Sequence, residues 1–168
     1  MKIAVIGYSG AGKSTLAKKL SAHYGCPLLY LDTVQFEAGW KERDRAEAKA
    51  IVADFLKQPA WIIDGNYRSF HHQKRMEEAD RIIFMRFSRL RCLFQAYRRY
   101  LQHKNATRES MAEGCREKFD WEFARWILWQ GRSKEIRRRY AEICRRYADK
   151  VTVCRNRKEV NQLLDSLW

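Results

Sequence analysis

Proline and long apolar runs are both scarce in this 168-residue sequence. It contains only two prolines, and no apolar stretch comes near the roughly 20 residues that a membrane-spanning helix needs. Its five cysteines are an odd number without any Cys-x-x-Cys pair, a pattern that suggests neither a disulfide framework nor a zinc knuckle. The first residues lack the apolar segment and the cleavage site of a signal peptide. We therefore expect a cytoplasmic protein that has no membrane contact and keeps its cysteines reduced.

Acidic residues are scarce in one stretch of the chain. The sequence holds 34 Lys and Arg against 20 Asp and Glu, a net charge of +14, and residues 81–158 hold 22 of the basic residues but only 8 of the acidic ones. Arg outnumbers Lys there, and the planar guanidinium suits bidentate contacts with phosphate. The excess predicts a surface or cleft for anions, either polyphosphate or nucleic acid, while a solvated helix face is the alternative.

Short apolar runs alternate with helical periodicity along the whole chain. We expect strands at residues 2–6, 28–31, 61–63, 81–85 and 150–154. We expect helices at about 13–24, 44–57, 70–79, 88–103, 119–148 (in two pieces that part near Gly131) and 158–167. Such alternation implies a parallel sheet covered on both faces. The prediction is a three-layer α/β/α fold with a five-stranded parallel sheet in a single domain over residues 1–168, in which residues 104–132 form a helical, lid-like insertion.

A glycine-rich segment follows the first expected strand and precedes the first expected helix. Gly7-Tyr8-Ser9-Gly10-Ala11-Gly12-Lys13-Ser14 fits the P-loop pattern G-x-x-x-x-G-K-[ST] without a mismatch. In such a loop the backbone N–H groups turn inward toward phosphate oxygens, and the helix adds its positive end. We expect catalytic Lys13 to reach the β- and γ-phosphates and the Ser14 hydroxyl to ligate Mg²⁺. The residues expected to hold ATP are Gly7, Ser9, Gly10, Ala11, Gly12, Lys13, Ser14 and Thr15.

A second motif ends the third expected strand. Asp64-Gly65-Asn66-Tyr67-Arg68 resembles the Asp-Gly-x-x-Arg stretch of adenylate-kinase-like nucleoside monophosphate kinases, which are P-loop NTPases. The resemblance implies that Asp64 helps to hold Mg²⁺ and that Arg68 grips the phosphate of the acceptor. A carboxylate beside a P-loop and an Arg facing a phosphate agree with that interpretation. The alternative is an ordinary Asp-Gly turn.

Over nearly its full length the chain resembles the bacterial DNA topology modulation proteins, a branch of these P-loop kinases. The resemblance rests on the P-loop, Leu31-Asp32, Gly39-Trp40, and residues 61–67, 112–115 and 119–129. The name of that family implies a role in DNA supercoiling, whereas its motifs imply phosphoryl transfer to a small molecule. Such relatives often carry an acidic residue after the fourth strand, where this chain has Arg86. Asp64 is therefore the main acidic candidate for a metal.

Two residues are candidates for holding the acceptor. Asp32, after the second strand, is expected either to accept a hydrogen bond or a proton from a substrate hydroxyl, or to cap the following turn. Trp40 either stacks on a ring of the substrate or packs within the protein. Both interpretations stay open for both residues.

Arginines of the basic stretch are candidates for stabilising charge in phosphoryl transfer. Arg99 and Arg132 are the expected catalytic arginines, and the other candidates are Arg108, Arg116 and Arg125. Resemblance to adenylate-kinase-like folds further places Arg155 and Asn156 near the adenine. His71 and His72 lack partners at metal-ligand spacing and are expected at the polar surface.

The sequence therefore predicts a P-loop kinase, which transfers phosphate from ATP, with Mg²⁺, to a small-molecule acceptor, with a nucleotide or nucleoside as the first expectation. The alternative is a nucleotide-regulated DNA-binding protein that affects DNA topology through its arginine-rich helices, although no groove-reading motif is recognisable. A third candidate is an ATPase switch coupled to a protein partner. The chain is expected as a monomer or a homodimer.

Overall fold

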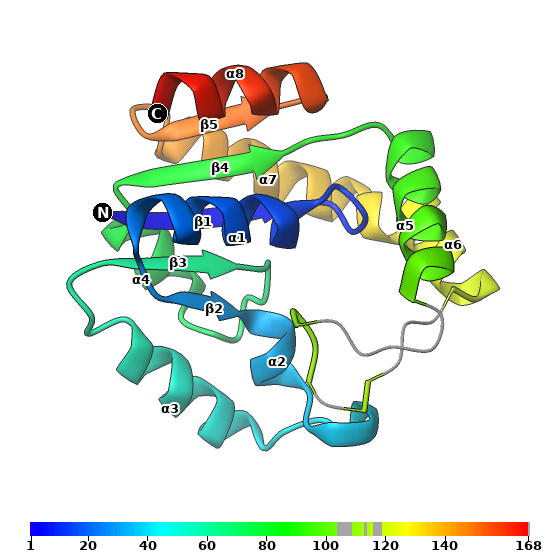
Figure 1. Ribbon diagram of the computed structural model, residues 1–168, viewed down its shortest axis with the longest axis horizontal. Coiled ribbons are helices and arrows are strands. Elements are labelled where there is room, and N and C mark those ends of the chain that lie inside the picture. Colours follow the sequence, from blue (N-terminus) through cyan, green and yellow to red (C-terminus); the bar gives the residue numbers. More distant parts are fainter. Residues whose placement is uncertain (104–108, 113, 116–118, 168) are drawn as a thin grey trace.

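A twisted parallel sheet forms the centre of the computed structural model, which describes residues 1–103, 109–112, 114–115 and 119–167. The five strands lie in the order β2-β3-β1-β4-β5 and all pair in parallel (Figure 1). Their bounds are β1 (Lys2–Gly7), β2 (Leu28–Tyr30), β3 (Trp61–Asp64), β4 (Arg81–Met85) and β5 (Val151–Cys154). The predicted five-stranded parallel sheet is thus confirmed.

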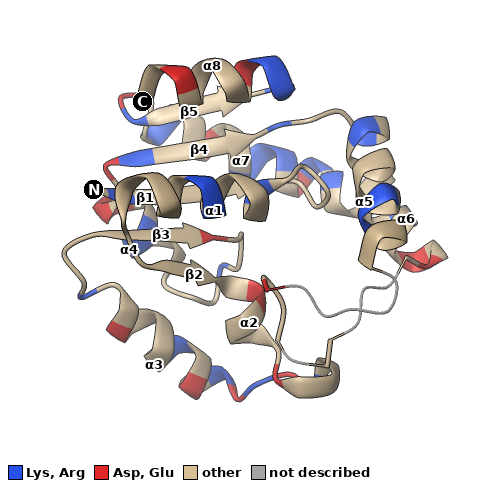
Figure 2. Cartoon of the chain, viewed as in Figure 1, with Lys and Arg blue, Asp and Glu red and all other residues tan. Residues whose placement is uncertain are grey.

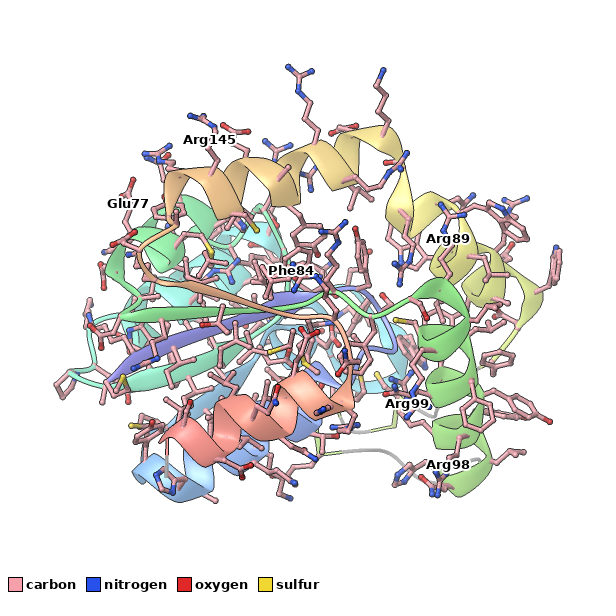
Figure 3. The ribbon with its side chains drawn as sticks, turned by 90° about the horizontal axis from the view of Figure 1, so that it is seen from above. Glu77, Phe84, Arg89, Arg98, Arg99 and Arg145 are labelled. Carbon is pink, nitrogen blue, oxygen red and sulfur yellow. The ribbon has the colours of Figure 1, made fainter. Side chains whose placement is uncertain are left out.

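Helices cover both faces of this sheet. The α-helices are α1 (Lys13–Tyr24), α2 (Leu31–Gln35), α3 (Arg45–Phe55), α4 (His72–Glu78), α5 (Arg89–His103), α6 (Trp121–Leu128), α7 (Lys134–Arg146) and α8 (Arg157–Leu167). Two short 3₁₀ helices are η1 (Ala38–Trp40) and η2 (Gln130–Arg132). In Figures 1 and 3, α1 and α8 lie on one face of the sheet, and α4 and α7 lie on the other. This arrangement gives the three predicted layers.

Strand β1 is central because its sequence is apolar without interruption. Ile3, Ala4, Val5 and Ile6 are all at most 1% exposed, as expected for a parallel strand that is buried on both faces. The parallel register aligns Val5 with Asp64 of β3. The start of the P-loop and the acidic end of β3 therefore meet at the same edge of the sheet.

The chain after β2 differs from the prediction. The strand ends at Tyr30, one residue early, and Leu31 begins the short helix α2, so that Asp32 lies in the first turn of a helix. The Thr33 hydroxyl donates to the Tyr30 carbonyl at 2.7 Å. Leu31 is fully buried against Gly65, where an added Cβ would lie 2.8 Å from the Leu31 Cβ. Burial of Leu31 beneath this glycine turns the chain out of the sheet.

Part of the predicted insertion, residues 104–132, lies within the described residues. Helix α6 packs against α5, and a break at η2 separates it from α7, near Gly131 as predicted. Ala124 and Ile127 of α6 are buried, whereas Trp121 and Trp126 are 69% and 43% exposed. The candidate arginines Arg108 and Arg116 lie outside the described residues.

All five cysteines are unpaired thiols, and four of them are buried. Within the described residues, no helix is both long enough and apolar enough to cross a bilayer.

Candidate active site

The glycine-rich loop fits tightly against its neighbours. Gly10 has a φ of 78°, and a Cβ added there would collide with the carbonyl oxygen of Cys92, which belongs to α5. Gly12 has a φ of 89° and precedes the first turn of α1. L-residues with side chains rarely adopt these angles. The glycines therefore let the loop turn tightly and end at a helix N-terminus, where backbone N–H groups favour an anion.

Lys13, Ser14 and Asp64 lie together beneath this loop. The Ser14 hydroxyl donates to the Asp64 carboxylate at 2.6 Å, across 50 residues of sequence, and Asp64 is only 5% exposed. The Lys13 ammonium donates to the carbonyl of Tyr8 at 3.1 Å. A hydroxyl and a carboxylate are oxygen ligands of the kind that Mg²⁺ prefers. The donor set of Ser14 and Asp64 therefore fits that ion.

Asn66 and Tyr140 brace the start of the loop. The Asn66 side chain accepts from the Gly7 N–H at 3.0 Å and donates to the Gly7 carbonyl, and the Tyr140 hydroxyl donates to the same carbonyl at 3.2 Å. Burial raises the pKa of Tyr140, so its hydroxyl stays a donor. Sequence reasoning gave neither residue a role, although Asn66 lies within the motif that it singled out.

Asp32 and Tyr67 meet on the other side of the same edge. The Tyr67 hydroxyl donates to one carboxylate oxygen of Asp32 at 2.9 Å. Burial, and then the charge of Asp32, raises the pKa of Tyr67. Tyr30 aligns with Asp64, the candidate metal ligand, in the β2–β3 register. Asp32 follows Tyr30 by two residues.

A cleft of about 1440 Å³ opens at this edge. It is large enough for a nucleotide together with a second small molecule. Of the predicted site residues, the cleft brings together Gly7, Ser9, Gly10, Gly12, Lys13, Ser14, Thr15, Asp32, Trp40, Asp64 and Arg99. Ala11 is fully buried inside the loop. From α6, the Trp126 indole donates to the Ser9 hydroxyl at 3.3 Å and so lies against the P-loop.

Four predicted arginines within the described residues do not line the cleft. Arg125 of α6 is exposed to solvent. Arg132 is 9% exposed, donates to the Phe87 carbonyl at 2.8 Å, and lies over the Tyr8 ring with its guanidinium carbon 3.8 Å from the centroid. Arg68 is exposed to solvent. Arg155 is exposed and lies 3.6 Å from the Glu159 carboxylate.

Four arginines that sequence reasoning left unassigned line the cleft: Arg91, Arg98, Arg139 and Arg157. Arg98 and Arg99 project from the second half of α5, whereas Arg145 of α7 lies at the far end of the molecule (Figure 3). A Cβ added at Gly12 would lie 3.6 Å from the Arg157 guanidinium. Nearby, Asn156 accepts from the Glu159 N–H at 3.0 Å and caps α8. The turn into α8 thus directs Arg157 toward the P-loop.

The expectation for His72 was wrong. His72 is half-buried and lines the cleft instead of the polar surface, at the first residue of α4, a helix that packs against the central strand β1. Burial, and then the charges of Arg75, Arg139 and Arg68, lowers the pKa of His72 from 6.5 to about 4. The imidazole is therefore neutral at pH 7. Among the described residues, no cluster of three His, Cys, Asp or Glu side chains is arranged to hold a metal.

No protein-family model matches the chain, and no curated protein matches it. Among solved structures, the chain is similar to a crystal structure of shikimate kinase from Bacteroides thetaiotaomicron, with a TM-score of 0.53 and 16% sequence identity. The similarity covers 99% of this chain and 98% of that chain. It shows the predicted P-loop α/β fold. Membership of the DNA topology modulation proteins is not confirmed, and the comparison does not support the DNA-binding alternative.

Proposed function

We propose that this protein transfers the γ-phosphoryl group of ATP to a hydroxyl group of a small molecule. The observation that carries the proposal is the 2.6 Å contact between Ser14 and Asp64 beneath a complete P-loop, in the cleft that also contains Asp32. A P-loop alone indicates only that a triphosphate is bound. A carboxylate on the acceptor side adds a group that accepts the proton of an attacking hydroxyl.

The residues of the cleft have different roles in the proposed reaction. The N–H groups of the loop and of the first turn of α1 bind the phosphates, and Lys13 neutralises their charge. Ser14 and Asp64 would hold Mg²⁺, which, when bound, offsets the negative charge of the phosphate oxygens. Arg99 and Arg157 line the cleft as further cations. Tyr67 orients the Asp32 carboxylate by donating to one of its oxygens.

The test is ADP release from ATP with Mg²⁺ and a panel of hydroxyl compounds. Lys13→Ala should lower kcat/KM at least a hundredfold, as loss of a cation that stabilises developing charge commonly does. Lys19→Ala is the matched control, because Lys19 is an exposed lysine of the same helix. It should change kcat/KM less than twofold.

Two outcomes would refute the proposal. One is ADP release that survives Lys13→Ala. The other is slow ADP release that no acceptor accelerates, since this is the behaviour of an ATPase switch.

A further inference from the structure

The charges that line the cleft are unevenly distributed, with most of its arginines on α5 and α8 and three of its carboxylates near β2 and β3. Figure 2 shows basic residues along α5 and acidic residues at the end of β3 and in α2. The arginines of α5 and α8 that line the cleft are Arg91, Arg98, Arg99 and Arg157. The carboxylates that line the side of β2 and β3 are Asp32, Asp64 and Glu109, and two more, Asp120 and Glu122, line the cleft at the start of α6, which packs against α5. A triphosphate in the P-loop would therefore have arginines close by, and an acceptor beside β2 and β3 would have carboxylates close by.

Asp32 is the carboxylate best placed to meet the acceptor. Asp64 is engaged by Ser14, and Glu109 pairs with Lys18 near the solvent. Asp32 accepts one hydrogen bond from Tyr67 and, within the part of the chain that the structure describes, pairs with no cation. A partly buried carboxylate favours a hydroxyl or a cation beside it and disfavours a second anion.

Within the described residues, the remaining charged groups on this side form no ion pair with Asp32. Arg139 pairs with Glu135 at 3.0 Å, and His72 is neutral at pH 7. Arg68, the predicted clamp for an acceptor phosphate, is exposed and does not line the cleft. Burial, and then the negative charges of Glu109 and Asp64, raises the pKa of Tyr30 to about 12. The electrostatic environment on this side is therefore negative at Tyr30.

Aromatic rings complete this side of the cleft. Tyr30, Trp40 and Tyr67 all line it. The Trp40 ring is held edge-on against Phe36, with 5.3 Å between the ring centroids, and the backbone N–H of Trp40 donates to the Cys115 sulfur at 3.2 Å. Aromatic faces next to carboxylates suit a sugar face or a protonated amine.

We propose that the phosphoryl acceptor is a hydroxyl compound without an anionic group, and that a protonated amine strengthens its binding through Asp32. This inference rests on the proposed function. In the reaction the acceptor oxygen forms a bond to the γ-phosphorus, and the bond from that phosphorus to the bridging oxygen of ADP breaks. The hydroxyl proton passes to Asp32 and ADP leaves.

The experiment uses sugars that differ in charge at pH 7: glucosamine as the cation, glucose as the neutral compound and glucuronate as the anion. Adenosine and AMP form a second matched pair. Binding is measured calorimetrically to the protein saturated with Mg²⁺ and a non-hydrolysable ATP analogue, and ADP release is measured with ATP. We expect glucosamine to bind at least tenfold more tightly than glucuronate, and adenosine at least tenfold more tightly than AMP.

Asp32→Asn tests the residue itself. Loss of a charge-assisted hydrogen bond should weaken glucosamine binding about ten- to a hundredfold and leave glucuronate binding unchanged or stronger, so that the preference for the cation disappears. Asp54→Asn is the control, because this aspartate is 80% exposed on α3. It should leave both affinities within twofold.

The outcomes separate the inference from the proposed function. Tighter binding or faster ADP release with glucuronate or AMP overturns the inference while the kinase proposal stands. Failure of both neutral and cationic compounds to bind the nucleotide-loaded protein also overturns it. If the ATP analogue itself does not bind, the proposed function fails and the inference falls with it.

Discussion

Arg75 offers a stringent test of how the site is built, because its guanidinium is fully buried and has no acidic partner within the described residues. Its three nitrogens donate to the carbonyls of Phe70 at 2.8 Å, Gly65 at 3.2 Å and Tyr67 at 2.6 Å. These bonds shape the segment that carries Tyr67, and Tyr67 in turn orients Asp32. We predict that Arg75→Met destabilises the fold and lowers activity together.

Two opposing terms set the magnitude of the effect. Hydrogen bonds to a charged donor contribute about 1.5–3 kcal/mol each, so that losing three of them costs about 4.5–9 kcal/mol. Against this, burial lowers the pKa of Arg75 from 12.5 to about 10. That shift corresponds to about 3 kcal/mol of desolvation, which the substitution relieves. The net loss of unfolding free energy should therefore be about 1.5–6 kcal/mol.

Arg75→Lys should be no milder than Arg75→Met. An ammonium keeps the desolvation cost but cannot span three carbonyls as the guanidinium does. Urea unfolding gives the free energies, and ADP release gives the activity. Lys74→Met is the matched control on the same helix, since Lys74 is 55% exposed and its ion pair with Glu78 is long, at 3.7 Å. It should change the unfolding free energy by less than about 0.5 kcal/mol.

The result that would refute this reasoning is an Arg75→Met protein within about 1 kcal/mol of the wild type. An Arg75→Lys protein clearly more stable than Arg75→Met would equally show that charge, and not the geometry of the three donors, governs the segment.

Two further predictions concern stability and nucleotide binding. Because the pKa of His72 is lowered to about 4 in the folded protein, the unfolded state takes up its proton at a higher pH, and the free energy of unfolding should fall by about 2–3 kcal/mol between pH 6.5 and pH 4. Urea unfolding at both pH values should show that His72→Gln lacks this part of the loss. Equal losses in the two proteins would contradict the assignment. Gly10→Ala should weaken ATP binding at least tenfold in calorimetry, because its Cβ collides with the Cys92 carbonyl, whereas Gly25→Ala, which also has a positive φ but has open space around it, should leave ATP affinity unchanged.

The fold and the glycine-rich loop were predictable because both depend on residues that are close together in the sequence. The apolar run of β1, the spaced glycines and Lys13 follow one another within a few residues, and each has a structural meaning that needs no distant partner. The positions of Asp32 and Asp64 near one edge of the sheet were also predictable, since the carboxyl ends of parallel strands meet there. The early end of β2 before Leu31 was not predictable, because it depends on a contact with Gly65, which is far away in the sequence.

The sequence predicts that arginines meet a ligand, but it does not predict which arginines line the cleft. Four candidates lie outside the lining of the cleft, namely Arg68, Arg125, Arg132 and Arg155, whereas Arg157 lies close to Gly12. The direction of Arg157 depends on where α8 begins, and helix boundaries are the least certain part of a sequence-based prediction. The role of Asn66 was missed because its two hydrogen bonds to Gly7 join the segment after β3 to the end of β1, a contact that residue type alone does not reveal.

Arginine serves three distinct physical purposes in this chain, and composition cannot separate them. Arg75 and Arg132 are buried and donate to backbone carbonyls, so their charges strengthen hydrogen bonds inside the protein. Arg91, Arg98, Arg99 and Arg157 face the cleft, where a polyphosphate would meet them. Others, such as Arg146, pair with surface carboxylates: its partner Glu77, at 3.2 Å, lies at the end of the molecule opposite Arg98 and Arg99 (Figure 3). The excess of basic residues over 81–158 is therefore not one anion-binding surface, and only burial and direction distinguish the arginines that a ligand would contact.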